Sequence, residues 1–402
     1  MSWRHWLTDA RTGRVVAPID IPSFSWQMSV GDFGFTTTAK NLGEVDASNL
    51  TIPWSALNAD TPAERAHLLS MGRRALCSAW VHDGVADTRG TPIMWGVLGE
   101  REDTWLDTTF PLYSPMSLLD SRYAIRDGAF RDTKSTDTVS WTGLSLRGLA
   151  SNLINLATNQ KNGGTLPFDA TYVNEHGNHQ RTNYRAWNVQ NLGVKSLLTN
   201  LANAQGGPDM TFRPYWSDGT HVRCRFLAGS DADIYLDMDH APIVLNSFPG
   251  GGSLEDLTIS YALPYQRVYG TGAGTDASVL TTLAEDLTSI TGPMDPPILR
   301  EMTYSDSDME NLGVLKSKVR AALAANRITG MQFTGSINVD DTNSNGTLLH
   351  PLGSFWPGEV FHLDVSGFPT LPDGRYETRL MEMSGNQTSK IKLQFDVMDA
   401  LF

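Results

Sequence analysis

Apolar and polar residues alternate along two neighbouring segments in the first third of the chain. These segments are RALCSAWVHDG (74–84) and TPIMWGVLGE (91–100). The apolar residues that share a face are Cys77, Ala79 and Val81 in the first segment and Ile93, Trp95 and Val97 in the second. A period of two residues is typical of β-strands. We therefore predict a β-hairpin across a loop that contains Asp83-Gly84, with TWLDTTFPLY (104–113) as the next antiparallel strand.

The middle of the chain changes to a helical period. Two segments place leucine and valine three or four residues apart and stop before glycine pairs, as amphipathic helices do. Their apolar residues are Leu146, Leu149, Leu153 and Leu156 in the first helix and Val194, Leu197, Leu198 and Leu201 in the second. Thr142 is a possible N-cap of the first helix. Two strands follow, MTFRPYW (210–216) and HVRCRFLAG (221–229), so this region is predicted to be α+β.

The last third of the chain returns to strands. We expect one long strand over LTISYALPYQRVYG (257–270), and later strands over EVFHLDV (359–365) and KIKLQFDV (390–397). The residues predicted to face the core are Phe361, Leu363 and Val365 in the second of these, and Ile391, Leu393, Phe395 and Val397 in the third. One helix interrupts them, with Leu312, Leu315, Val319 and Leu323 on a single stripe.

These patterns divide the chain into three regions. Residues 1–122 and 251–402 are rich in alternating strands, the second of them with helices, and residues 123–250 form an α+β middle. Each strand-rich end could close into a small barrel. The sequence thus predicts a mainly β protein of several domains.

Composition narrows the possible functions. The chain has 402 residues and a net charge of −13 spread along its length, which argues against a surface that binds nucleic acid. Cys77 and Cys224 are the only cysteines, so neither a disulfide framework nor a CxxC metal site is expected. No signal peptide and no membrane span is predicted, because no window approaches eighteen apolar residues.

The stretch VYGTGAG (268–274) is a candidate phosphate-binding turn. Gly270 and Gly272 fit the first two positions of a dinucleotide fingerprint, but the third position is Thr275. The fingerprint also requires a parallel sheet, whereas the surrounding segments suggest antiparallel strands. We therefore interpret the stretch as a corner between a strand and a helix, capped by Thr275 or Asp276.

Two polar clusters resemble metal sites in composition only. In GSDADIYLDMDH (229–240) the acidic residues lack the spacing of a calcium loop and alternate instead with apolar residues, which predicts a solvated strand face. The residues predicted to face water are Asp233, Tyr235, Asp237 and Asp239, and those on the other face are Ile234, Leu236 and Met238. In EHGNH, Glu175, His176 and His179 lack the HExxH order of zinc enzymes, so a polar loop is the simpler interpretation.

Neither a nucleophile motif nor a sugar-binding pattern is clear. GLSLR (143–147) lacks the last glycine of a GxSxG elbow. A carboxylate pair for glycoside cleavage stays open, because such pairs meet in space rather than in sequence. The eleven tryptophans allow sugar stacking, but Trp80 and Trp95 lie within alternating strands, where packing is the commoner role.

Taken in order, these elements resemble the tail hub proteins of long-tailed bacteriophages, in particular those of phages that infect actinobacteria. The similar segments are GRVVAPIDIPSFSWQMSVGDFGFTTTAKNL with its tryptophan-containing hairpin, MWGVLGERED, SLLDSRYAIRD, LLTNLANAQGGPDMTFRPYWSDGTHVRCRFLAGS, VYGTGAG, LGSFWPGEVFHLDVSG and YETRLMEMSG. Together they span nearly the whole chain.

The resemblance implies a tail-hub architecture in which two small β-barrel-like domains flank an α+β region. It implies a homotrimeric ring at the tail tip of the virion, assembled in the host cytoplasm. That ring would join the hexameric tail tube or distal tail ring to fibre or tip proteins, with the tape measure protein as a further possible partner, and DNA would pass through it without specific binding.

The resemblance implies no chemistry. We therefore expect a structural protein rather than an enzyme, with no catalytic, cofactor-binding or metal-binding residues and no cofactor. Two alternatives stay open: a cell-wall-degrading or nucleotide-dependent enzyme, and a carbohydrate-binding protein of the tail tip.

Overall fold

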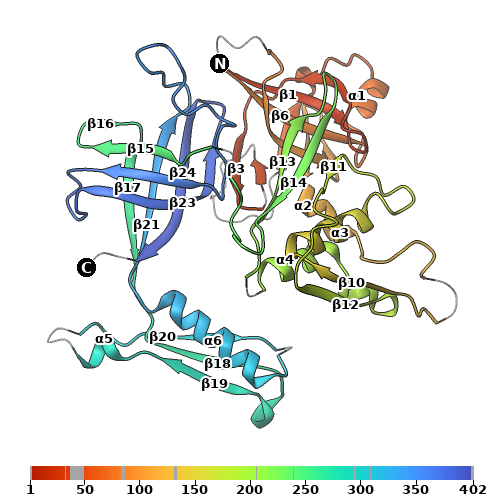
Figure 1. Ribbon diagram of the computed structural model, residues 1–402. Coiled ribbons are helices and arrows are strands. Elements are labelled where there is room, and N and C mark those ends of the chain that lie inside the picture. The colour runs from red at the N-terminus through yellow and green to blue at the C-terminus, as the bar shows by residue number, and fades with distance from the viewer. Residues whose placement is uncertain are drawn as a thin grey trace.

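The protein is mainly β, as predicted, with its strands in two large curled sheets and several smaller ones. The computed structural model describes residues 2–31, 33–36, 49–82, 87–130, 134–204, 206–238, 240–292, 296–307 and 309–399. In Figure 1 the N-terminal sheet and the helical middle lie on one side, the C-terminal sheet lies on the other, and a smaller αβ unit hangs below. The predicted loop at Asp83-Gly84 lies outside the described residues.

The N-terminal sheet has seven strands in the order β2-β1-β6-β7-β9-β5, with β8 paired to β9. Its strands are β1 (Ser2–Asp9), β2 (Val15–Ile19), β5 (Asn49–Pro53), β6 (Arg74–Val81), β7 (Thr91–Leu98), β8 (Glu102–Asp103) and β9 (Asp107–Tyr113). The predicted hairpin is present, because β6 and β7 pair antiparallel, and β9 follows antiparallel to β7. A short 3-10 helix, η1 (Trp54–Ala56), and α1 (Pro62–Leu68) link β5 to β6.

The middle region is α+β, with two amphipathic helices beside short strands. Its elements are α2 (Pro115–Leu118), η2 (Leu119–Ser121), β10 (Thr138–Leu144), α3 (Leu146–Ala157), β11 (Phe168–Asp169), β12 (His179–Arg185), η3 (Ala186–Asn191), α4 (Val194–Ala202), β13 (Met210–Trp216) and β14 (Val222–Ala228). The predicted N-cap Thr142 is wrong. Strand β10 continues to Leu144, so the cap is Ser145, whose hydroxyl accepts a hydrogen bond from the Gly148 N–H at 3.0 Å.

The C-terminal sheet has nine strands, and two of them come from the N-terminal part of the chain. Its strands are β3 (Ser25–Ser29), β4 (Phe33–Thr36), β15 (Ile243–Phe248), β16 (Gly251–Gly252), β17 (Glu255–Ala262), β21 (Gly330–Asn338), β22 (Val360–Val365), β23 (Gly374–Gly385) and β24 (Lys390–Asp399). The predicted inward residues of β22 and β24 are buried except Val397, which is 55% exposed. Val397 lies against Gly330, which has no side chain to cover it.

Residues 263–329 form a separate unit between β17 and β21. These two strands pair with Ala262 opposite Gly330, so the chain leaves and rejoins the sheet at one place. The unit contains β18 (Arg267–Thr271), η4 (Asp276–Ser278), β19 (Thr281–Glu285), α5 (Thr288–Thr291), β20 (Glu301–Ser305) and α6 (Leu312–Asn326). The single strand predicted over 257–270 is therefore wrong: it breaks at Pro264, which has no N–H to donate to a ladder.

Strands β6 and β7 are buried on both faces. Ala75, Cys77, Trp95 and Val97 pack into the core of the helical middle. The core shared with the C-terminal sheet takes the other large residues of the two strands: Leu76, Trp80, Ile93, Met94 and Leu98. The predicted face of Ile93 is therefore wrong, because a register shift in the pairing of β6 with β7 skips this residue and it packs on the same side as its neighbour Met94. The alternation in the sequence also did not show that both faces are covered. This sheet is thus the layer on which the two main cores meet.

An aromatic cluster joins the N-terminal and C-terminal sheets. The Trp3 ring packs edge-on against Trp26 and Trp80, with ring centroids 5.6 and 5.2 Å away. Trp26 belongs to β3, which pairs with β23. The indole N–H groups of Trp3 and Trp26 both donate to the Asn386 carbonyl oxygen at 3.2 Å. One backbone oxygen of the C-terminal sheet therefore anchors two tryptophans of the N-terminal segment.

Strand pairing crosses the predicted region boundaries, since β15 (243–248) also pairs with β16 (251–252) across the division at 250. Strand β3, from within residues 1–122, pairs with β23, and β15, from within 123–250, pairs in parallel with β22. The division at 122 and 250 stays a prediction, and the pairing shows that the regions exchange strands.

We expect His5 to make stability depend on pH. The His5 ring is buried beside Phe24 and bonds to the Ser78 hydroxyl at 2.8 Å, and burial lowers its pKa to about 3. Below pH 6.5, the pKa of His5 in the unfolded chain, the unfolded chain binds a proton on His5 and the folded chain does not. The free energy of unfolding should therefore fall by up to about 1.4 kcal/mol per pH unit as the pH drops from 6 to 4.5.

Denaturant unfolding at several pH values measures this slope. His5→Gln should flatten it, whereas the control Ser78→Ala removes the bonding partner but not the titrating ring and should lower stability while keeping the slope. His350, whose pKa burial also lowers, adds a slope of the same sign in both variants. An unchanged slope in His5→Gln would contradict the assignment.

Candidate functional site

The glycine-rich turn is a packing feature of the αβ unit. Strand β18 leads through the single turn η4 into β19, which pairs antiparallel with it, so the predicted corner between a strand and a helix is wrong. The expectation of antiparallel neighbours is also only half right, because β20 pairs with β18 in parallel and the sheet is mixed. With no long helix starting after the glycines, the turn lacks the helix N-terminus that a dinucleotide site uses.

Each glycine has its own steric reason. A Cβ at Gly270 would lie 2.3 Å from the Val319 Cγ2 of α6, and a Cβ at Gly272 would lie 2.7 Å from the Met309 oxygen. Gly274 has a φ of +127°, which only glycine adopts readily. The glycines let α6 and the 309 segment lie directly on β18, and Thr275 precedes η4 as its N-cap.

The acidic run at 229–240 is an irregular connection rather than the predicted strand. Its alternation nevertheless describes the burial, since Leu236 is buried while Asp233 and Asp237 are exposed. Leu236 occupies the place where a Cβ on Gly358 would lie, which ties the connection to the C-terminal sheet. Asp239 lies outside the described residues.

The EHGNH segment contributes to a polar network at the start of α3. Glu175 pairs with Arg147 at 2.8 Å, and His179 lies 3.4 Å from Asp231. The other Asp231 oxygen accepts the Leu146 N–H at 2.9 Å. The structure thus brings together His179 and Asp231 from the two clusters, and they hold the helix N-terminus. His179 begins β12, so the predicted polar loop ends before it.

The remaining candidate groups are structural. Within the described ranges no three His, Cys, Asp or Glu side chains gather as a metal site would require. Cys77 and Cys224 are buried, and burial raises the pKa of both thiols. Ser145 of GLSLR is the N-cap of α3. The helices in the described part are all too short or too polar to cross a membrane.

The tryptophans divide into buried and exposed groups. Trp80 and Trp95 are buried, as their alternating strands predicted, and the Trp95 indole donates to the Thr8 hydroxyl at 3.0 Å. Trp105 and Trp187, by contrast, are 98% and 61% exposed. Sequence alone gave no signal for this difference, because exposure depends on which loops protrude.

A buried carboxylate connects the middle region to the C-terminal sheet. Glu359 is 1% exposed and pairs with Arg213 of β13 at 2.9 Å, with His240 at 3.4 Å on its other oxygen. That second oxygen also accepts the Trp356 N–H at 2.9 Å. Nearby, Arg379 of β23 pairs with Asp209. A carboxylate removed from water needs such partners, so these contacts fix the two regions against each other.

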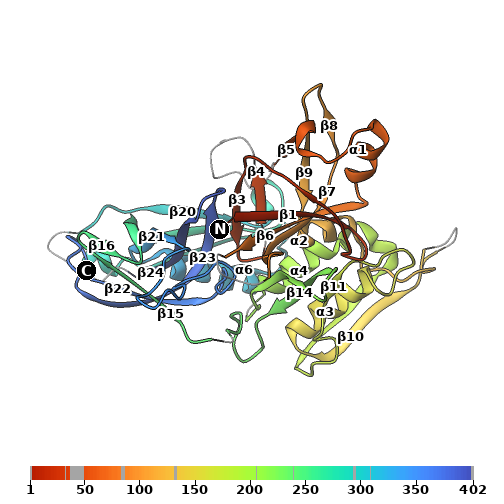
Figure 2. The ribbon, with the colours of Figure 1, turned by 90° about the horizontal axis from the view of Figure 1, so that it is seen from above.

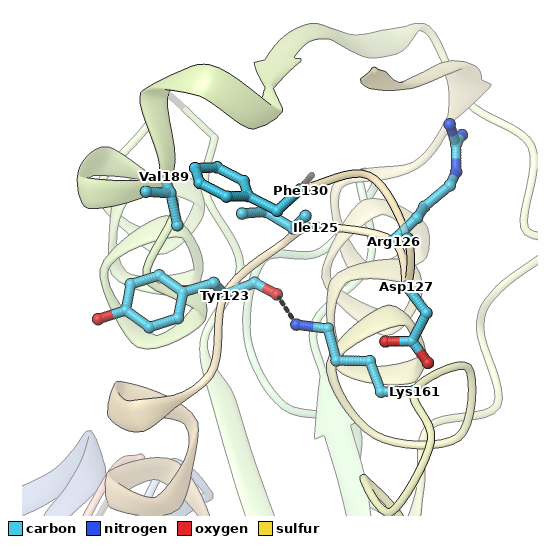
Figure 3. Close-up of a pocket in the computed structure, with 8 residues that line it drawn as sticks. Tyr123, Ile125, Arg126, Asp127, Phe130, Lys161 and Val189 are labelled. Atoms are coloured by element: carbon cyan, nitrogen blue, oxygen red, sulfur yellow. Dashed lines mark hydrogen bonds between the residues drawn. The ribbon is translucent and has the colours of Figure 1, made fainter. Parts of the chain in front are cut away.

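A hollow of about 360 Å³ opens beside α3, after the end of β9 (Figure 3). Its apolar walls are Tyr123, Ile125, Phe130 and Val189, and its charged lining is Arg126, Asp127 and Lys161. The Lys161 ammonium donates to the Tyr123 carbonyl oxygen at 2.6 Å, and burial lowers the pKa of Lys161. Arg126 points away from the hollow and pairs with Asp137 at 3.0 Å. The hollow therefore offers an aromatic wall with one cation at its edge.

A second hollow of about 620 Å³ lies at one end of the C-terminal sheet, between residues 247–257 and 365–369. Glycine backbone and the rings of Phe248 and Phe368 make up much of its wall. The smaller hollow is lined by one acid, Asp127, and the larger by two, Glu255 and Asp256. Both acids of the larger hollow pair with the Lys390 ammonium, at 3.0 and 2.8 Å, so in this structure they serve as ion-pair partners.

Comparison with known proteins shows the fold but no sequence relative. No protein-family model matches the chain, and no curated protein matches it either. Among solved structures, the 43 kDa tail protein of prophage MuSo2 from Shewanella oneidensis is similar over 98% of both chains, at 9% identity and a TM-score of 0.50. This chain therefore has the fold of that phage tail protein from end to end.

A second similar structure belongs to a larger protein. A chain of the Francisella PdpA–VgrG complex in its half-lidded form aligns with 99% of this chain at 9% identity and a TM-score of 0.50. The alignment covers 58% of that chain, so this protein spans little more than half of its length.

We expect Gly270→Ala to destabilise the αβ unit. The added Cβ collides with Val319, so α6 must shift, at a cost of about 1–3 kcal/mol. Gly374→Ala is the matched control, because nothing lies within 4 Å of its Cβ. Denaturant unfolding measures both variants.

The collision with Val319 predicts that the effects of substitutions at positions 270 and 319 on stability depend on each other, which a nucleotide site at Gly270 would not require. In a Val319→Ala background, Gly270→Ala should cost less, because the colliding methyl is gone. NAD, FAD and ATP should leave the melting temperature unchanged. A nucleotide-dependent increase that Gly270→Ala abolishes would restore the phosphate-binding interpretation.

Proposed function

We propose that this protein is a structural component of a bacteriophage tail and forms the hub at the tail tip. The observation that carries the proposal is the fold, which matches a prophage tail protein over 98% of both chains. In this proposal three copies form a ring that joins the hexameric tail tube or distal tail ring to fibre or tip proteins. The phage would be long-tailed and of the actinobacteriophage type, and the ring would assemble in the host cytoplasm.

The arrangement of the sheets supports a ring. Each chain carries two large curled sheets, so three chains present six, which suits docking onto a sixfold tube. Both sheets end in strands with an open edge: β2 and β5 in the first, and β17 in the second. Pro18 and Pro53 blunt the first two edges, whereas β17 contains no proline over its eight residues.

The proposal is non-enzymatic and includes no cofactor, no metal and no site residues. It also keeps the three regions 1–122, 123–250 and 251–402 as the units of the hub. The geometry described above supports it, because the polar candidates serve as helix caps and ion pairs within the fold.

Electron microscopy of tails that contain the protein tests the ring. We expect three copies around the tail axis at the tip, a subassembly of about 132 kDa, three times the 44.1 kDa of one chain. Labelling the C-terminus with a small rigid tag should add three densities at one level of the tail. Six densities at one level, or density along the whole tube, would contradict a hub.

The channel of such a ring should not hold DNA. The net charge of −13 repels phosphate, so we expect no measurable binding of duplex DNA at an ionic strength of about 0.15 M. Fluorescence anisotropy with a labelled duplex measures this, and a basic DNA-binding protein is the positive control. Micromolar binding would count against passage of DNA through the ring.

A further inference from the structure

The hairpin between β8 and β9 ends in a tip that the fold holds in one shape. The Thr104 hydroxyl donates to the Asp107 carboxylate at 2.7 Å and accepts the Asp107 N–H at 3.1 Å. Trp54 fixes the tip from the side, because its indole N–H donates to the Thr104 oxygen at 2.9 Å and its backbone N–H to the Leu106 oxygen at 3.0 Å. The tip is therefore preorganised, and binding would cost it little conformational entropy.

This tip exposes two large apolar side chains. Trp105 is 98% exposed and Leu106 is 79% exposed, the two highest values among the large apolar residues that the structure describes. In Figure 2 the hairpin of β8 and β9 projects away from the body of the molecule. A rigid, protruding tryptophan is typical of an anchor residue at the centre of a protein interface.

The hollow beside α3 is concave and apolar where the tip is protruding and apolar. Its size, about 360 Å³, is at the small end of binding pockets, and it suits one or two side chains better than a large ligand. Phe130 and Tyr123, on its wall, are 59% and 41% exposed, so this aromatic surface is open. Edge-to-face contact with a tryptophan would cover it.

The tip is acidic and the hollow is not. Segment 99–107 carries Glu100, Arg101, Glu102, Asp103 and Asp107, a net charge of −3. Because Arg126 points away and pairs with Asp137, the hollow is lined by one cation, Lys161, and one anion, Asp127, and is near neutral on a protein whose total charge is −13. Such charges add orientation and speed of association rather than much affinity.

The tip and the hollow of one chain cannot meet each other. The tip stands at the start of β9, and Tyr123 follows the far end of that strand, past α2 and η2. Seven strand residues span roughly 20 Å, and β9 is held rigidly within its sheet. A tip that fits the hollow must therefore come from another copy, in a head-to-tail contact.

We propose that Trp105 and Leu106 of one copy dock into the hollow lined by Tyr123 and Phe130 of the next copy. The inference rests on the proposed function, since a head-to-tail contact builds a closed ring only if the subunits surround an axis. It names the contact that links neighbouring hub subunits.

Pairwise cross-linking of full-length chains tests the contact. One chain carries Leu106→Cys and the other Asp127→Cys, so that Trp105, Tyr123 and Phe130 stay in place, and mild oxidant links thiols whose Cβ atoms approach to about 4 Å. Both native thiols, Cys77 and Cys224, are buried and should not react. The matched control pairs Ile298→Cys with Asp127→Cys, because Ile298, in the αβ unit, is 75% exposed and Leu106 is 79% exposed.

At a chain concentration of about 0.5 mM even a weak contact is populated. We expect the 106 and 127 pair to link on the order of tenfold faster than the control pair, through its higher effective concentration. Trp105→Ser in tails should release the hub subunits, whereas Ile298→Ser should not. Equal linking rates for the two pairs would overturn the contact.

The cross-linking test of this contact and the microscopy test of the hub can fail independently. A threefold ring seen in tails, combined with equal linking rates, would leave the hub standing and remove this contact. Rapid linking of the 106 and 127 pair in a protein that forms no ring would keep the contact and remove the hub.

Discussion

The rest of the structure depends on a sheet that is buried on both faces. Strands β6 and β7 direct apolar residues to both faces of the sheet, and each face covers a different core. One core joins this sheet to the C-terminal sheet through Trp3, Trp26 and Trp80, and the other joins it to helices α3 and α4. Both cores are completed by residues of this sheet. The C-terminal sheet on one side and helices α3 and α4 on the other are therefore held in one position relative to each other.

Polar contacts add direction to that constraint. Apolar packing resists separation but is poor at fixing a rotation, whereas hydrogen bonds and ion pairs hold only at particular angles. The Asn386 oxygen receives two indole N–H groups at one joint, and Glu359 holds Arg213 and His240 at the other. Each buried polar group would be costly to leave unpaired, so the two joints are specified geometrically.

Much of the local structure could be predicted from the sequence, but the way distant segments combine could not. Periodicity identified the β6–β7 hairpin, the apolar stripes of α3 and α4, and the inward residues of β22. In α6 three of the four predicted stripe residues are buried, but Leu312, in the first turn, is 39% exposed. A period of two says which residues share a face, but not which strand lies alongside. The placement of β3 beside β23 and of β15 beside β22 therefore carried no signal.

The predictions that failed did so for local reasons. Strand periodicity continued through Pro264, although the missing N–H ends the ladder there. The glycines at 270–274 suggested a turn into a helix, but the helix that packs on Gly270 is α6, more than forty residues later. The ion pairs of Glu359 and Arg379 join residues far apart in sequence, and Trp105 differs from Trp95 only in where the fold places it.

A rigid body of this kind is what a head-to-tail contact requires. In a closed ring the angle between the tip of one subunit and the hollow of the next is repeated at every subunit, so a small change in that angle would turn the ring into an open helix. Here the tip lies just before β9 and the hollow follows the other end of that strand, with the doubly buried sheet between them. The strand that connects the two features is thus part of the least deformable layer of the protein. The αβ unit, by contrast, is joined to the C-terminal sheet by two crossings of the chain, and its described part has a core of five buried apolar residues, so a change in its position need not disturb that angle.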